Sequence, residues 1–192
     1  MELAVKNYKQ KGMTCSIACL LMVLEYYHLI PKAVSFYEKK YYNLYKSKYT
    51  LGVPFSAIAW HFVKKGLKTM LIHSEKDMFS NEKHIFEDAV FKNLIFEYND
   101  FLLRAQKLGL LVSNRVKLDP IFLKKQLEMG RLVVLAGMQD SFFHAILLCG
   151  FTADKFIVCD PLKSQKIKMT KEELESFMMT PIGSWAIVVY KD

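Results

Sequence analysis

The first half of the chain places apolar residues at helical spacing. After Thr14, apolar positions recur every three or four residues as far as Tyr27, which predicts a helix capped by Thr14 or Ser16. A short apolar run over 68–73 indicates one early strand. Elsewhere the same spacing, with Pro, Ser, Asn or Asp near several starts and Gly after some ends, predicts further helices. They cover residues 31–46, 55–65, 81–107 (with a break near Asn99–Asp100) and 119–130.

The second half consists mostly of short runs rich in Val, Ile, Leu and Phe, a composition typical of strands. Thr152–Lys155 suits a hairpin turn, and Thr170 can cap a helix over 171–178. Helices followed by antiparallel strands indicate an α+β fold. We expect one domain over 1–192, helical to about residue 130 and sheet-forming from about residue 131. The predicted strands cover residues 131–138, 143–151, 155–159, 165–168 and 185–190.

Composition argues against several classes of protein. Hydrophobic residues make up 52% of the 192 residues, which is too many for a disordered chain. The longest apolar run, 17–24, is far shorter than the roughly 20 residues that span a bilayer, so we expect no membrane span. The first residues lack the pattern of a secretory signal, which favours the cytoplasm. The net charge of +8 comes from scattered lysines without a nucleic-acid-binding motif, so nucleic acid is not an expected partner.

The four cysteines do not suggest disulfides or a metal site. Cys15 and Cys19 are one helical turn apart, which is too far for a normal bridge. Cys149 and Cys159 fall inside apolar strands and resemble small buried hydrophobic residues. The chain has no Cys-x-x-Cys pair and no His pair at ligand spacing, so we expect no zinc and no cofactor.

Cys15 lies where the first predicted helix begins. The unpaired N–H groups of a helix N-terminus stabilise an anion, and the thiolate is the reactive form of cysteine. His144, at the start of a predicted strand, would take the Cys15 proton, and Asp160, after the next strand, would orient the imidazole. Gln10, five positions before Cys15, would place its amide beside the Cys15 backbone N–H as an oxyanion hole. Together these residues predict a nucleophilic thiol with its base.

The predicted hairpin leaves one difficulty. Its simple register brings Asp160 closer to Leu147 than to His144, so the site requires a bulge or an offset. Asp140 is an alternative partner for His144, although it more naturally belongs to the loop before the strand. Trp185 would either cover the His–Asp pair from solvent or lie in the core as part of the final strand.

The order of these motifs resembles that of the papain-like cysteine peptidases. Within that group the pattern is similar to the bacteriocin-leader peptidases, which precede peptide-exporting ABC transporters and cut after a double-glycine leader. The resemblance implies a papain-like fold, with Cys15 as nucleophile, His144 as base, Asp160 as orienter and Gln10 as oxyanion donor. It covers Tyr8 to about Asp160. Two positions depart from the family pattern: Ser16 replaces Gly, and Gln10 is one position closer to the cysteine.

The resulting expectation is a thiol hydrolase that cleaves a peptide bond in a peptide or protein substrate, such as a leader or precursor peptide. An acyl or peptidyl transferase, or a deamidase, would use the same triad. A catalytically inactive papain-like binding domain is the third alternative. The Tyr-rich segment 36–49 would either bind a partner protein or pack against the third predicted helix.

Overall fold

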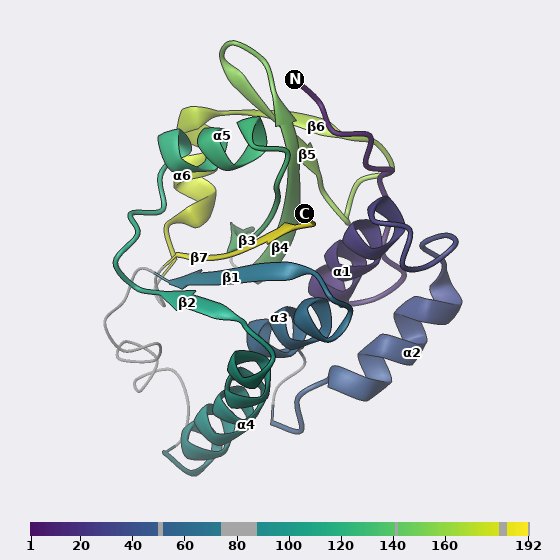
Figure 1. Ribbon diagram of the computed structural model, residues 1–192, viewed down its shortest axis with the longest axis vertical. Coiled ribbons are helices and arrows are strands. Elements are labelled where there is room, and N and C mark those ends of the chain that lie inside the picture. Colours follow the sequence, from purple (N-terminus) through teal and green to yellow (C-terminus); the bar gives the residue numbers. More distant parts are fainter. Residues whose placement is uncertain (50–51, 74–87, 141, 181–183, 192) are drawn as a thin grey trace.

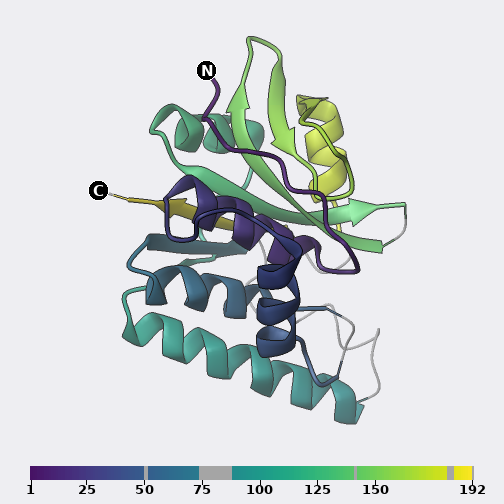
Figure 2. The same ribbon diagram turned by 90° about the vertical axis from the view of Figure 1, so that its right-hand side faces the viewer.

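A seven-stranded sheet divides the molecule into two helical layers (Figures 1 and 2). The computed structural model describes residues 1–49, 52–73, 88–140, 142–180 and 184–191. Helices α1 and α3 cover one face of the sheet, with α2 and α4 packed outside them, and α5 and α6 cover the other face. The α+β prediction is confirmed. The elements are α1 (Cys15–Tyr26), α2 (Ser35–Tyr45), α3 (Phe55–Lys64), β1 (Lys68–His73), α4 (Asp88–Lys107), β2 (Leu111–Ser113), α5 (Pro120–Glu128), β3 (Leu132–Gln139), β4 (Phe142–Phe151), β5 (Lys155–Cys159), β6 (Ile167–Thr170), α6 (Lys171–Met178) and β7 (Trp185–Tyr190).

The strands follow the order β2-β1-β7-β3-β4-β5-β6. All neighbouring pairs are antiparallel except β1 and β2, which are parallel. The strand predicted over 68–73 is confirmed as β1, but the expectation that the rest of residues 1–130 is helical is incomplete, because β2 lies within them. Strand β2 was not predicted at all, since its three residues are too few to show a period of two. The late strand β7 joins β1 to β3 at the centre of the sheet.

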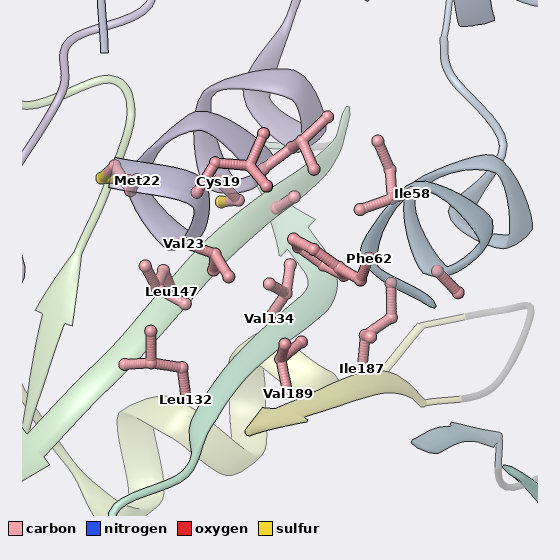
Figure 3. Close-up of a cluster of buried hydrophobic side chains, with 14 of the residues drawn as sticks. Cys19, Met22, Val23, Ile58, Phe62, Leu132, Val134, Leu147, Ile187 and Val189 are labelled. Carbon is pink, nitrogen blue, oxygen red and sulfur yellow. The ribbon is translucent and has the colours of Figure 1, made fainter. Parts of the chain in front are cut away.

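Alternate residues of the central strands supply two separate cores. Val134 on β3 and Ile187 on β7 face the layer of α1 and α3, where they meet Val23 and Phe62 (Figure 3). Their neighbours, such as Val133, face α5 and α6 instead. Because side chains of a strand alternate between its faces, a sheet covered on both sides must be apolar throughout. This explains the continuous apolar runs in the second half of the sequence.

Two of the predicted helix starts are confirmed in detail. The Asp119 carboxylate accepts the Phe122 backbone N–H at 2.9 Å, directly before Pro120 at the start of α5. Thr170 begins α6 with a capping box, in which its hydroxyl accepts the Glu173 N–H and the Glu173 carboxylate accepts the Thr170 N–H. Each arrangement satisfies backbone donors that have no partner inside the helix.

Other helix predictions were wrong in their boundaries. Helix α2 begins at Ser35 rather than at Pro31, because the Ala33 N–H is bonded to the Glu25 carboxylate at 2.7 Å and Val34 is extended. Helix α4 is continuous, so the expected break near Asn99–Asp100 is absent. Its predicted start, over 81–87, lies outside the described residues. Strand β6 covers Ile167–Thr170 rather than 165–168.

Candidate active site

Cys15 is the first residue of α1 and is partly exposed, whereas residues 16–24 of the same helix are all buried. The helix is therefore fixed in the core along most of its length, and only its two ends, Cys15 and Glu25–Tyr26, are partly exposed. Figure 2 shows α1 lying against the sheet. Backbone N–H groups at such a tip have no partner within the helix and stabilise an anion. Cys15 is thus partly exposed to solvent and lies where the helix N-terminus stabilises a negative charge.

His144 and Asp160 form a buried hydrogen-bonded pair. The distance between His144 Nε2 and Asp160 Oδ1 is 2.7 Å, and the two residues are only 3% and 2% exposed. The same Asp160 oxygen accepts the Leu162 backbone N–H at 2.8 Å, which fixes the carboxylate. Because Nε2 is engaged by Asp160, Nδ1 is the ring nitrogen that remains for a second partner.

The pKa values of the pair are shifted in opposite directions. Burial by itself lowers the pKa of His144, but hydrogen bonds with Asp160 and Cys15 outweigh it and raise that pKa to about 9. Burial raises the pKa of Asp160, and the hydrogen bonds from His144 and from the Leu162 N–H more than reverse this, so that it lies below its usual value. Both shifts favour the charged forms, an imidazolium at His144 and a carboxylate at Asp160.

A β-bulge brings Asp160 to the correct face of the sheet. Strands β4 and β5 pair Phe151 with Phe156 beside the turn, but the register shifts at Cys149, so that Leu147 pairs with Cys159. Extending this register by one residue places Asp160 opposite Ile146, on the same face as His144. Without the extra residue Asp160 would lie opposite Leu147 and point to the other face. The offset that the sequence requires is thus a single inserted residue.

Gln10 lies near the pair, but its side chain does not take the predicted direction. Its backbone N–H donates to the Pro161 carbonyl at 2.9 Å, beside Asp160. Its side-chain amide donates to the Gly12 carbonyl, and Gln10 Oε1 is buried without a hydrogen-bond partner among the described residues. The loop before α1 is therefore joined to the segment after β5, while the amide of Gln10 is held within its own loop.

Two other candidates are placed outside the site. Asp140 is exposed in the turn between β3 and β4, with a positive φ of 47°, as its loop position suggested. Trp185 belongs to the core of β7, where its ring packs on Tyr98 at 5.5 Å and on His73 at 5.8 Å. The interpretation of Trp185 as a core residue is the one that agrees with these contacts.

The aromatic rings beside His144 are Phe142 and Phe177, with centroid distances of 6.2 and 6.4 Å. Phe177 on α6 was not predicted for this position. It comes close because Gly137, which pairs with His144 across β3 and β4, has no side chain. A Cβ at Gly137 would lie 2.2 Å from the Phe177 backbone oxygen. A glycine inside a strand often marks such a close approach, and this was the available signal.

The remaining cysteines are structural. Cys19, Cys149 and Cys159 are free and fully buried, which confirms that the strand cysteines behave as small core residues. The Cys149 and Cys159 sulfurs are 3.6 Å apart and share a hydrogen bond. Within the ranges that the structure describes, no three His, Cys, Asp or Glu side chains gather to hold a metal ion. Nor does any helix in those ranges have the length and apolar character needed to cross a bilayer.

The Tyr-rich segment 36–49 is divided between core and surface. Tyr41 and Tyr45 are buried, and their rings stack and contact His61 of α3. Packing against the third helix thus accounts for these two residues. The exposed part of the segment includes Phe36, Leu44 and Tyr49.

No family model and no curated protein matches the sequence. Among solved structures, the crystal structure of a "putative C39-like peptidase" from Bacillus anthracis aligns with 98% of this chain and 96% of that chain. The two share 15% sequence identity, with a TM-score of 0.48. At that similarity the alignment says nothing about the chemistry of this chain.

Proposed function

We propose that the protein is a thiol hydrolase that cleaves a peptide bond, with Cys15 as nucleophile, His144 as base and Asp160 as orienter. The observation that supports this most is the arrangement around His144. Its Nε2 bonds Asp160 at 2.7 Å, and Cys15, at the tip of α1, is among the groups that raise the pKa of His144. Acyl transfer to sulfur requires a nucleophile, a base and a carboxylate that orients the base, and the proposal assigns these roles to Cys15, His144 and Asp160.

In the proposed reaction, the Cys15 thiolate attacks the carbonyl carbon of the scissile amide. The C–N bond breaks as the His144 imidazolium gives its Nδ1 proton to the leaving amine, and a thioester with Cys15 remains. Water then attacks the thioester while His144 takes its proton. The C–S bond breaks, the carboxylic acid leaves, and the thiolate–imidazolium pair is restored. The N–H groups at the tip of α1 would stabilise the oxyanion, with Gln10 as a further donor if its amide turns from Gly12.

The proposed substrate is a peptide or protein segment, and a double-glycine leader is the specific form implied by the sequence resemblance. The experiment incubates the protein with synthetic peptides that contain or lack a Gly-Gly site and identifies the products by mass spectrometry. Cys15→Ala should abolish turnover, and Cys19→Ala, one buried helical turn further, should retain it. Equal turnover by Cys15→Ala would contradict the proposal. Addition of an amine that diverts the acyl group would identify a transferase.

A catalytically inactive binding domain is the second candidate. The observation that favours it is the amide of Gln10, which donates to the Gly12 carbonyl of its own loop. An oxyanion donor held in this way contributes nothing to the transition state unless it turns. Iodoacetamide distinguishes the two functions, because Cys15 of an inactive domain would react no faster than free cysteine at neutral pH.

A further inference from the structure

Glu38, in the first turn of α2, is a buried carboxylate that links α2 to another part of the chain. The residue is 3% exposed, and carboxylates are rarely buried to this degree unless their oxygens are bonded. Three donors converge on it. Tyr8 Oη donates to Oε2 at 2.6 Å, the Lys11 backbone N–H donates to Oε1 at 2.9 Å, and Thr14 Oγ1 also donates to Oε1.

All three donors belong to the short segment that precedes α1. Tyr8 lies two residues before Gln10, Lys11 directly follows it, and Thr14 directly precedes Cys15. The Thr14 hydroxyl is at the N-cap position of α1, but it bonds to Glu38 instead of a helix N–H. The predicted side-chain cap of α1 is therefore absent, and the hydroxyl joins the two helices.

We propose that Glu38 is a positioning residue of the candidate site. Its carboxylate holds segment 8–14 in the shape that directs the Cys15 thiol to His144 and keeps Gln10 beside the tip of α1. The inference rests on the proposed function and adds a residue to it that touches no reacting atom. Because the three donors are neutral groups, Glu38 holds the segment by accepting hydrogen bonds and not by pairing with a positive charge.

This chemistry distinguishes Glu38→Gln from Glu38→Ala. In Glu38→Gln, the amide oxygen still accepts from the Lys11 N–H and the Thr14 hydroxyl, and the Tyr8 hydroxyl rotates to accept from the amide nitrogen. In Glu38→Ala all three donors lose their acceptor, each in a buried or half-buried hydrogen bond, and the segment is free to move. Displacement of a reacting group by about 1 Å can reduce a rate by about 100-fold.

The experiment measures the rate of Cys15 alkylation by iodoacetamide against pH, with the modified residue identified by mass spectrometry. The wild type should react faster than free cysteine at pH 6, since the proposed function requires an activated thiol. Glu38→Ala should react at least about tenfold more slowly than the wild type at pH 6. Glu38→Gln should stay within about threefold of the wild type, since about one neutral hydrogen bond is exchanged.

Glu25→Gln is the matched control. Its carboxylate also accepts a backbone N–H, that of Ala33 at 2.7 Å, but at the opposite end of α1, so the pH profile should equal that of the wild type. A loss of thermal stability in Glu38→Ala with an unchanged pH profile would assign Glu38 a structural role only and overturn the inference. Should Glu38→Ala not fold, Thr14→Val removes one donor at similar volume and should shift the profile in the same direction. An unchanged profile in that variant would equally overturn the inference.

The two proposals fail in different ways. A wild-type Cys15 that already reacts like a free thiol would overturn the proposed function and this inference with it. A wild-type profile with high reactivity at low pH that survives unchanged in folded Glu38→Ala would overturn the inference alone.

Discussion

His144 and His61 are two equally buried histidines with opposite electrostatic behaviour. His144 is 3% exposed at the start of β4, and His61 is 4% exposed in α3. The pKa of His144 is raised to about 9, whereas burial lowers the pKa of His61 to about 4. The two sites therefore hold an imidazolium and a neutral imidazole at the same pH.

The partners of the two rings explain the difference. His144 faces a carboxylate and a thiol, which both favour the charged ring. His61 Nδ1 shares a hydrogen bond with the neutral Tyr45 hydroxyl, and its Nε2 is buried without a hydrogen-bond partner among the described residues. The lysines that follow, Lys65 and Lys64, lower the pKa of His61 further. Burial alone disfavours the charge at both sites, so the neighbouring acid decides which histidine is suited to chemistry.

The largest expected effect is on thiol reactivity. His144→Asn should reduce the rate of Cys15 alkylation by iodoacetamide at pH 6 by about 10- to 100-fold, because the imidazolium that stabilises the thiolate is lost. His61→Gln should leave this rate unchanged in the folded protein, which circular dichroism would verify. Equal losses in the two variants would show that general core disruption, rather than the charge on His144, controls Cys15.

The free energy of unfolding should depend on the protonation of His144 in the alkaline range. Because its folded pKa of about 9 exceeds the unfolded value of about 6.5, the native state binds one more proton between these values, and stability falls as pH rises. The stabilisation present below pH 6.5 is of the order of 1–3 kcal/mol. Urea unfolding of the wild type across this range should show the loss, and Asp160→Asn should show a smaller slope. A slope in Asp160→Asn as steep as that of the wild type would exclude the pair as its source.

In the acidic range, the free energy of unfolding should depend on the protonation of His61, with the opposite pH dependence. Its folded pKa of about 4 lies below the unfolded value, so the unfolded chain binds one more proton in between, and stability falls as pH decreases from about 6.5 to 4. The loss should be about 1–3 kcal/mol, and His61→Gln should remove this contribution. The comparison of urea midpoints at the two ends of the range, in wild type and variant, measures it. An identical acid dependence in His61→Gln would refute the assignment.

The smallest expected effect concerns the partner of His61. Tyr45→Phe should lower the free energy of unfolding by about 1–2 kcal/mol, because the buried Nδ1 loses its hydrogen bond. The rate of Cys15 alkylation should not change. Tyr27→Phe is a suitable control, since its hydroxyl donates to the Val189 carbonyl at 3.1 Å in a different part of the core. A change in Cys15 reactivity in Tyr45→Phe would connect the two histidine sites.

The sequence predicted the elements of the site better than the contacts between them. Local signals were sufficient to predict α1, whose apolar residues recur at a regular helical spacing. They were also sufficient for α5 and α6, whose N-cap residues are Asp119 and Thr170. The need for an offset between β4 and β5 followed from counting residues back from the turn. Which residue is inserted depends on pairing across the whole sheet, so Cys149 could not be recognised in advance.

Long-range partners were the main omission. Glu38 is an ordinary charged residue in a lysine- and tyrosine-rich helix, and only the packing of α2 beside the loop before α1 shows its three donors. The direction of the Gln10 amide is likewise set by the fold of its loop, not by its distance from Cys15 along the chain. The burial of His61 and its contact with Tyr45 are likewise properties of tertiary structure that no local pattern around it indicates.

The position of β7 has a consequence for how the chain acquires its shape during synthesis. Strand β7 (Trp185–Tyr190) lies between β1 and β3, so the β1–β2 pair and the β3–β6 group share no edge without it. Synthesis must therefore reach residue 190 before the two halves of the sheet can pair through β7. Until then both halves have an unpaired strand edge, and unpaired edges favour aggregation of a partly folded chain.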